Sequence, residues 1–201
     1  MANTSCALST INILCWMIEM QVVDTNIPEV KIISLDIYKD SRGMFVESWR
    51  DSWASEIGLK DRLVQDNFSR SVSNTLRGLH YQVEKPQAKL VRVTSGSVFD
   101  VAVDLRRSSS TFGHWVGEEL SAENGKMLFI PKGFAHGFLV LSDIVEYTYK
   151  CSDYYYPDGE RTLIWNDKDV GIRWPIPNES DLVISNKDLA GKPLVDCQAF
   201  E

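Results

Sequence analysis

From residue 30 onward, the chain consists mainly of short runs rich in Val, Ile, Phe and Tyr, separated by Gly, Ser, Asn and Asp. Such runs are typical of β-strands, and their spacing of roughly 8 to 12 residues is typical of a β-sandwich or barrel. A tight turn is expected at Ser95-Gly96, between two of the runs. About eight strands are expected, in VKIISLDIY, TLRGLHYQ, KLVRVTSG, SVFDVAVDLR, FGHWVGEEL, KMLFIPKG, AHGFLVLSD and VEYTYKCSD. The pattern predicts an all-β fold, an antiparallel jelly-roll barrel or sandwich.

Helical signals are few. ESWRDSWASEIGL, which ends at Gly58, is the one good helical candidate, and a second short helix is expected in SNKDLAG. The opening of the chain lacks a basic segment, and its apolar stretch is too short and too polar to span a bilayer. We therefore expect residues 1–19 to be an N-terminal extension without a role in the fold, or alternatively an arm that contacts a partner. Residues 20–201 are expected to form a single domain.

Charge and cysteine content limit the classes of partner. The 201 residues carry a formal net charge of −7, which argues against nonspecific binding to nucleic acid or to an anionic membrane. An anionic ligand would therefore need a local cluster of cations. The four cysteines are widely scattered and form no C-x-x-C pair, so neither a zinc site nor a disulfide framework is expected. A reducing cytoplasm is the simplest location.

One of only three histidines in the chain, His80, lies inside the predicted strand LRGLHYQ. A histidine there can be a packed core residue, a metal ligand or a proton-transfer group. Strand alternation places Gly78 and His80 on one face and Arg77 on the other. Because Gly78 has no side chain, it leaves room for a ligand beside the imidazole, although glycine in a strand equally often marks a bulge.

Several blocks in order resemble one enzyme family over roughly residues 20 to 195. The chain is similar to the dTDP-4-dehydrorhamnose 3,5-epimerase family, which are cofactor-independent, cupin-fold isomerases of nucleotide-sugar metabolism. The matching blocks are SRGMFVESW, QDNFSRS, LRGLHYQ, QAKLVRV, FDVAVDLRR, IPKGFAHGFLVLSD, YKCSDYYYPDGE, IWNDKDVGIRWP and ISNKD. The resemblance implies a homodimer in which the RGMFVE region reaches into the neighbouring subunit.

Epimerisation beside a ketone needs a base, an enolate stabiliser and an acid on the opposite face. The resemblance implies that His80 is the base, with Asp188 on its second ring nitrogen; Asp104 is the next candidate for that partner. Tyr149 matches the proton donor, although Tyr147 lies on the same predicted strand face. A phenol stays protonated at neutral pH and can deliver a proton. Lys89 maps to a lysine that can stabilise the enolate oxygen.

The remaining positions that the resemblance implies bind the substrate, a dTDP-sugar. Arginine suits the diphosphate because its guanidinium can bind phosphate oxygens in pairs. Tyr155 resembles the residue that stacks on the thymine ring, although Tyr154 or Tyr156 could take this role. His136 is expected to contact a substrate hydroxyl or to support residues that do, whereas His114 has no implied role. The full predicted binding set is Arg42, Glu47, Gln65, Asp66, Asn67, Arg77, His136, Tyr155, Glu160 and Lys187.

The expected reaction is conversion of dTDP-4-dehydro-6-deoxy-D-glucose to dTDP-4-dehydro-L-rhamnose, with proton exchange at C3 and C5. The alternatives are a C3-only epimerase and a sugar-nucleotide-binding cupin without turnover. A metal-dependent cupin oxygenase is disfavoured, because Tyr81 and Gln82 follow His80 where an H-x-H metal pair would be needed. If Arg77 and His80 both contact one substrate, the strand should bend or bulge near Gly78.

Overall fold

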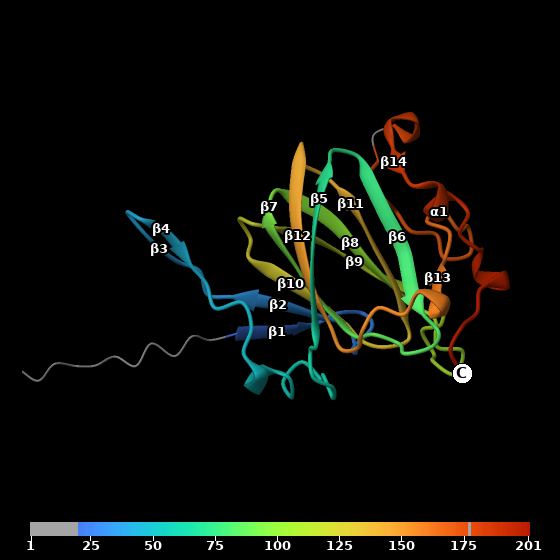
Figure 1. Cartoon of the computed structure of the whole chain (residues 1–201), viewed down its shortest axis with the longest axis horizontal. Coiled ribbons are helices and arrows are strands. Elements are labelled where there is room, and N and C mark those ends of the chain that lie inside the picture. The colour runs from blue at the N-terminus through green and yellow to red at the C-terminus, as the bar shows by residue number, and fades with distance from the viewer. Residues whose placement is uncertain (1–19, 177) are drawn as a thin grey trace, which may run out of the picture.

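A computed structural model of the chain describes residues 20–176 and 178–201. Within this part, two six-stranded sheets pack against each other, as Figure 1 shows. The predicted all-β fold is confirmed. The first sheet has the order β1 (Met20–Asp24), β2 (Lys31–Leu35), β10 (Lys126–Ile130), β7 (Lys89–Ser95), β12 (Ile144–Cys151) and β5 (Gln65–Val72). The second has the order β13 (Glu160–Thr162), β6 (Thr75–Gln82), β11 (Phe134–Val140), β8 (Ser97–Asp104) and β9 (Trp115–Ser121), with β14 (Val183–Ile184) paired to β6.

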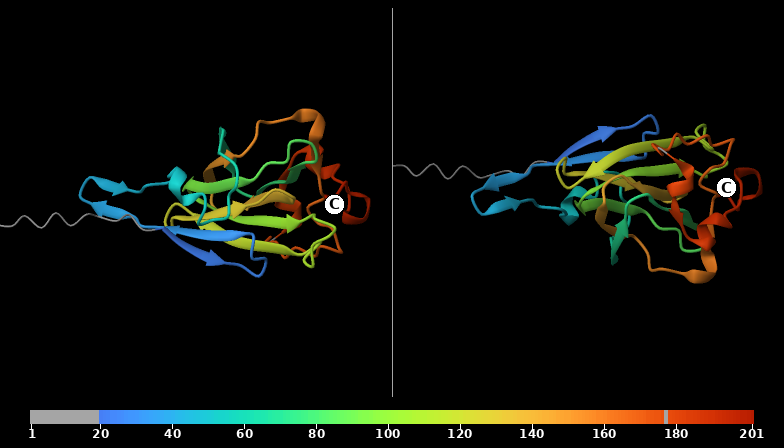
Figure 2. Two further views of the ribbon diagram at one scale, coloured as in Figure 1. Left: turned by 90° about the horizontal axis from the view of Figure 1, so that it is seen from below. Right: turned by 90° about the horizontal axis from the view of Figure 1, so that it is seen from above.

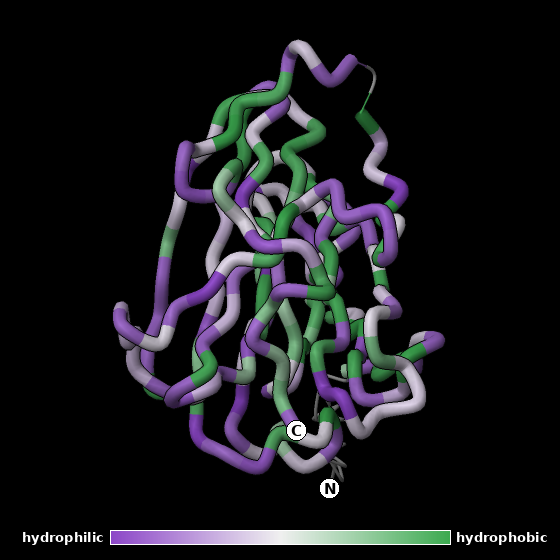
Figure 3. The backbone as a smooth tube through the Cα atoms, turned by 90° about the vertical axis from the view of Figure 1, so that its right-hand side faces the viewer, coloured by the Kyte–Doolittle hydropathy of each residue, from purple (hydrophilic) through white to green (hydrophobic). Residues whose placement is uncertain are grey.

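The main core lies between the two sheets. Alternate side chains of the central strands point inward, and fully buried residues such as Val91, Ala102 and Leu128 form one cluster. Figure 3 shows hydrophobic stretches along the central strands and hydrophilic residues at many of the turns. Removal of this apolar surface from water is the main driving force for the sheets to pack.

The predicted helix that ends at Gly58 is wrong. Only a single 3₁₀ turn, η1 (Asp51–Trp53), forms there, and turns follow it. Arg50 offers no side-chain cap to its first turn. Trp53 and Ile57 are buried in a second cluster against β2 and β10. The spacing of these apolar residues suits a helix, but tertiary packing buries them through a series of turns.

A short α-helix, α1 (Asn186–Leu189), forms inside the predicted segment SNKDLAG, so this expectation is confirmed. The Ser185 hydroxyl accepts a hydrogen bond from the backbone N–H of Asp188 at 3.1 Å and caps it. The other short helices are η2 (Pro157–Gly159), η3 (Glu179–Asp181) and η4 (Leu194–Asp196). The expected boundary at residue 19 stays a prediction, because residues 1–19 lie outside the described residues.

A bulge interrupts β6 where it pairs with β11. His80 lies opposite His136, but Arg77 lies opposite Phe138, so three residues of β6 span the distance of two on β11. The extra residue turns Arg77 to the same face of the sheet as His80. At Gly78 φ is +121°, and an added Cβ would lie 2.6 Å from the Gly137 Cα. The bulge expected near Gly78 is therefore confirmed, and only glycine fits it.

A hairpin of β3 (Tyr38–Asp40) and β4 (Gly43–Phe45) forms a separate two-stranded sheet. Figure 2 shows it extending along the long axis, away from the two main sheets. The side chains of Met44 and Phe45 are more than half exposed. A lone two-stranded hairpin is marginally stable in water, so these apolar side chains need a further surface against which to pack.

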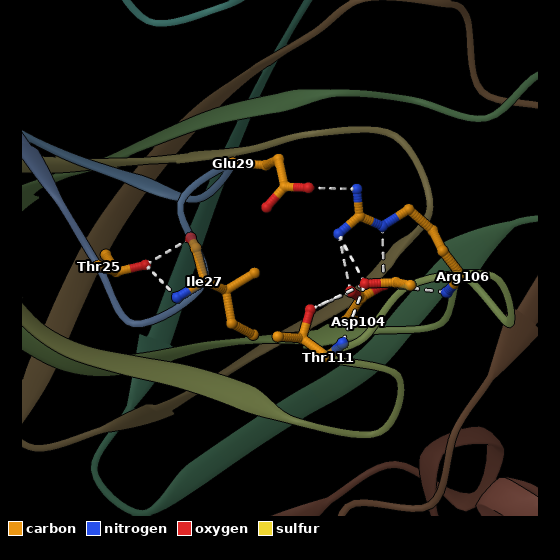
Figure 4. A network of polar contacts seen from close by, with 7 residues as sticks. Thr25, Ile27, Glu29, Asp104, Arg106 and Thr111 are labelled. Carbon is orange, nitrogen blue, oxygen red and sulfur yellow. Dashed lines mark hydrogen bonds and ion pairs between the residues drawn. The ribbon is translucent and has the colours of Figure 1, made fainter.

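A buried carboxylate joins the loop after β8 to the loop after β1 (Figure 4). Asp104 is fully buried, and Arg106 Nη2 lies 2.7 Å from its Oδ2. The hydroxyl of Thr111 donates to the same oxygen at 2.7 Å, and Arg106 Nη1 reaches Glu29 at 2.9 Å. Burial opposes ionisation, but the hydrogen bonds from Arg106 and Thr111 outweigh it and lower the pKa of Asp104 to about 2. The network joins the loop between β1 and β2 to the loop after β8.

Asp104→Asn is expected to lower the free energy of unfolding by about 3 kcal/mol at neutral pH, because Arg106 loses its buried partner. A carboxyl whose pKa falls on folding stabilises the protein above its unfolded pKa and loses that effect as pH falls toward its folded pKa. Denaturant titration should therefore show the gap between the two proteins shrinking by about 1 kcal/mol between about pH 5 and about pH 3. Asp24→Asn, which breaks an exposed ion pair with Lys31, is the control and should cost below about 1 kcal/mol. A loss no larger than that of the control would contradict the role of the network.

Candidate active site

A cavity of about 340 Å³ lies between the two sheets, at the end where β6 finishes and β7 begins. Polar and aromatic side chains from both sheets line it. Among the predicted site residues, those that line the cavity are Gln65, Asn67, His80, Lys89, Tyr149, Tyr155 and Glu160. The fold thus gathers half of the predicted site residues around one space.

His80 is held by a buried carboxylate. Its Nε2 lies 2.6 Å from Asp188 Oδ1, and the backbone N–H of Gly78 donates to Asp188 Oδ2 at 3.2 Å. Burial opposes ionisation of Asp188, but the hydrogen bonds from His80 and Gly78 outweigh it and lower its pKa. A carboxylate beside Nε2 keeps the ring proton on that nitrogen and leaves Nδ1 as the free basic nitrogen. Asp104 binds Arg106 instead, so the alternative partner for His80 is wrong.

Lys89 and Tyr149 face His80 from the other sheet. They lie on neighbouring strands, β7 and β12, where Cys151 pairs with Lys89 and Tyr149 with Val91. Burial raises the pKa of the Tyr149 phenol, and the positive charge of Arg77 opposes this rise. Burial lowers the pKa of Lys89, and the negative charges of Asp100 and Glu160 oppose this change. The cavity therefore has an imidazole on one side, and a phenol and an amine on the other.

Tyr147 does not reach the cavity. Its ring is fully buried and stacks on Phe138 with 4.4 Å between the ring centroids, and its hydroxyl donates to Asp100 Oδ2 at 2.5 Å. His136 is also buried, with its Nε2 3.0 Å from Asp100 Oδ1. Burial lowers the pKa of His136, which favours its neutral form. Tyr149 is thus the tyrosine of this strand at the cavity, and His136 lies behind the lining.

The mouth of the cavity holds a connected set of polar groups. The backbone N–H of Tyr155 donates to Gln65 Oε1 at 2.9 Å, and its hydroxyl donates to Glu160 Oε2 at 2.8 Å. Lys187 Nζ lies 2.5 Å from the same oxygen of Glu160. Of the three consecutive tyrosines, Tyr155 lines the cavity, whereas Tyr154 is exposed and Tyr156 packs under the ammonium of Lys85.

Several predicted binding residues lie elsewhere in the single chain. Arg42, on the projecting hairpin, is 88% exposed and pairs with Asp40, and Glu47 pairs with Arg50. Asp66 pairs with Lys150 and does not line the cavity. Arg77 is exposed beside the cavity, and its Nε donates to Ser71 Oγ at 3.0 Å. The chain alone therefore does not bring Arg42, Glu47 or Asp66 to the cavity.

Sequence reasoning missed part of the lining. Cys151 lies two residues after Tyr149 on the same strand face, so strand alternation alone could have identified it. Phe134 and Phe200 also line the cavity. Phe200 comes from the last residues of the chain and packs edge to face on Tyr81, a contact that no local pattern indicates.

Residues 20–176 and 178–201 contain no group of three or more His, Cys, Asp or Glu side chains placed to hold a metal ion. The same residues contain no helix long and apolar enough to cross a membrane.

Comparisons with known proteins point to one family. The model of the dTDP-4-dehydrorhamnose 3,5-epimerase family matches residues 24–196. A relative of that name from Neisseria gonorrhoeae is 53% identical over 86% of this chain, which spans 52% of the relative's length. A relative of the same name from Methanothermobacter thermautotrophicus is 50% identical, with 89% of this chain and 96% of the relative covered. A crystal structure of dTDP-6-deoxy-D-glucose-3,5-epimerase from Legionella pneumophila, in complex with dTDP-4-keto-L-rhamnose, superposes with a TM-score of 0.85 at 50% identity, covering 88% of this chain and 94% of that one.

Proposed function

Because the chain belongs to the dTDP-4-dehydrorhamnose 3,5-epimerase family, a family of isomerases, we propose that it converts dTDP-4-dehydro-6-deoxy-D-glucose to dTDP-4-dehydro-L-rhamnose. The observation that carries this proposal is the position of His80 and Tyr149 on facing sheets across one cavity. Inversion at carbon requires removal of a proton from one face and its return to the other. Groups on opposite walls meet that requirement.

His80 begins the reaction in this proposal. Its Nδ1 takes the proton from C3 or C5 of the sugar, and the electron pair of the broken C–H bond moves toward the C4 ketone to form an enolate. The Asp188 carboxylate on Nε2 stabilises the resulting imidazolium and holds the ring in place. General-base catalysis of this kind contributes about 10²- to 10⁴-fold to the rate.

Lys89 and Tyr149 complete the inversion. The ammonium of Lys89 stabilises the enolate oxygen, and loss of one such donor typically costs about 10²- to 10³-fold. Tyr149 then gives its phenolic proton to the opposite face of the carbon. Burial raises the pKa of Tyr149, so the phenol is protonated at neutral pH, and the charge of Arg77 stabilises the phenolate it leaves. Solvent returns a proton to Tyr149 and takes one from His80. Only protons move, so the proposed reaction needs no redox cofactor.

The nucleotide would bind at the mouth of the cavity. Arg77 is the exposed cation beside Tyr149 and is placed to bind the diphosphate. The exposed ring of Tyr155 offers a surface on which a base can stack, and Gln65 and Glu160 hold it. Asn67 lines the same cavity and would contact the sugar of the substrate.

A homodimer is part of this proposal. The projecting β3–β4 hairpin exposes Arg42, Met44 and Phe45. If this hairpin packs on a second copy, Arg42 can serve the partner's cavity, which would explain why it lies away from its own. Light scattering should then give twice the 22.8 kDa chain mass. A monomer that has full activity would contradict the shared site.

Product analysis tests the proposed reaction. Incubation of the purified protein with dTDP-4-dehydro-6-deoxy-D-glucose, followed by NMR, should show dTDP-4-dehydro-L-rhamnose. A C3-only epimerase would yield a product inverted at C3 alone, and a sugar-nucleotide-binding cupin would bind the substrate without changing it.

The scattered cysteines, of which Cys151 and Cys197 are free thiols, support a cytoplasmic location.

A further inference from the structure

The second sheet has a gap next to His80. Strands β6 and β11 pair as far as His80, which lies opposite His136. Beyond this pair, the described residues Tyr81 and Gln82 at the end of β6 have no ladder partners on β11. On its other side, β6 stays paired with β13 to its end. The end of β6 and the start of β11 are therefore not joined by the sheet, one residue beyond the proposed base.

Residues 197–200 occupy this gap. After β8 the chain first runs beside the start of β11, where the backbone N–H of Leu105 donates to the carbonyl of Gly133 at 2.9 Å. Phe200 then takes the place of β11. Its N–H donates to the Leu105 carbonyl at 2.9 Å, and its carbonyl accepts from the N–H of Arg107 at 2.7 Å. These bonds form an isolated parallel bridge that continues the sheet where β11 is absent.

Contacts with β6 and β13 hold the other side of this segment. The ring of Phe200 packs edge to face on Tyr81, with 6.0 Å between the centroids. Cys197 is 5% exposed and shares a hydrogen bond with the Tyr81 side chain. Arg161 of β13 donates from Nε to Gln198 Oε1 at 3.1 Å. Figure 1 shows the C-terminal end of the chain beside the ends of β6 and β13. The segment is thus fixed across the gap.

The side chain of Phe200 is part of the cavity wall. It lines the cavity together with Phe134, whereas its neighbours in the chain Gln198 and Glu201 are exposed to solvent. The segment is therefore a single layer between the cavity and the surface. A wall that excludes water strengthens electrostatic interactions inside an active site and prevents leakage of protons from reactive intermediates.

We propose that Phe200 closes the cavity beside His80 and keeps solvent from the base while the enolate exists. The proton that His80 removes then stays on the imidazolium until it returns to the same carbon or until Tyr149 protonates the opposite face. Without the ring, the imidazolium would exchange its N–H proton with solvent first. The proposal rests on the proposed function of His80, and the family resemblance implied no role for Phe200.

Alkylation of Cys151 tests the wall without any need for turnover. This thiol lines the same cavity, is 1% exposed, and has its pKa raised by burial. With saturating dTDP in the proposed nucleotide site, iodoacetamide should modify Cys151 about tenfold faster in Phe200→Ala than in wild type, because the new opening exposes the thiol. Mass spectrometry identifies the modified cysteine. Phe200→Leu, which keeps most of the apolar volume, should stay within about twofold of wild type.

The reaction in D₂O tests the effect on the base. In Phe200→Ala, kcat should fall about tenfold, and the ratio of deuterium exchange into unconverted substrate to formation of inverted product should rise about threefold or more. NMR gives both rates from one sample. Loss of folded protein would lower both rates together and leave their ratio unchanged, so the ratio reports on the wall.

The matched control is Phe112→Ala. Phe112 is also half-buried and packs under the guanidinium of Arg107, 5.6 Å from its ring centroid, but it does not line the cavity. This variant should match wild type in Cys151 alkylation and in the ratio. An unchanged alkylation rate or ratio in Phe200→Ala, or an equal change in the control, would overturn the proposal. If the wild-type protein formed no product, the proposed function would fail, whereas the alkylation rates would still decide whether Phe200 closes the cavity.

Discussion

His80→Ala is expected to lower kcat by about 10³-fold, within the range for loss of a general base. The imidazole is the group that removes the substrate proton in the proposed mechanism, and it faces Lys89 and Tyr149 across the cavity. The affinity for dTDP should stay close to wild type, because the proposed nucleotide site is at the mouth of the cavity, around Tyr155. Product formation followed by NMR, together with calorimetric titration of dTDP, measures both quantities.

His114→Ala is the matched control for this prediction. His114 is exposed and does not line the cavity, so its replacement should leave kcat and dTDP affinity unchanged. If His80→Ala turned over as fast as wild type, His80 would not be the base. If the wild-type protein and His80→Ala both bind dTDP and neither forms product, the protein is instead a sugar-nucleotide-binding cupin without turnover.

Tyr149→Phe should separate the two halves of the reaction. Removal of the phenolic hydroxyl removes the acid, so formation of inverted product should fall by about 10²- to 10³-fold. His80 keeps its partner Asp188 and can still remove the substrate proton and return a solvent proton to the same face. In D₂O the variant should therefore exchange deuterium into unconverted substrate faster than it forms product.

Two rates measured in one reaction decide this prediction. NMR gives deuterium incorporation into the substrate and product formation from the same sample, so misfolding, which would abolish both, is distinguished from loss of the acid. Equal reduction of exchange and inversion in a folded variant would contradict the assignment of Tyr149 as acid, because it would mean that proton removal also depends on the hydroxyl.

The sequence predicted the strands of the site better than its contacts. Alternation placed His80 on β6, and the all-β fold follows from the apolar runs. The choice of Asp188 came from the family resemblance, because it lies 108 residues from His80 and no local pattern shows which loop packs there. The bulge that turns Arg77 toward the face of His80 could be inferred only from the conflict in their parity.

Other features required the folded chain. Strand β5, which carries Gln65 and Asn67, was not among the predicted strands because its polar residues alternate with few apolar ones. The helix predicted before Gly58 does not form, although its apolar residues are buried. The spacing of apolar residues thus indicated which side chains are buried, but not the backbone conformation of the segment. Arg42 and Glu47 were predicted for the site, but a hairpin that leaves the barrel carries Arg42 away from it, and local sequence does not record where a hairpin points.

In the proposed mechanism, one set of groups removes and returns protons on both sides of the C4 ketone. The most direct measurement is the reaction of the wild-type protein with dTDP-4-dehydro-6-deoxy-D-glucose in D₂O, followed by NMR of the product. We predict deuterium at both C3 and C5, with both centres inverted. Deuterium at C3 alone, or no incorporation by a protein that binds the substrate, would contradict this mechanism.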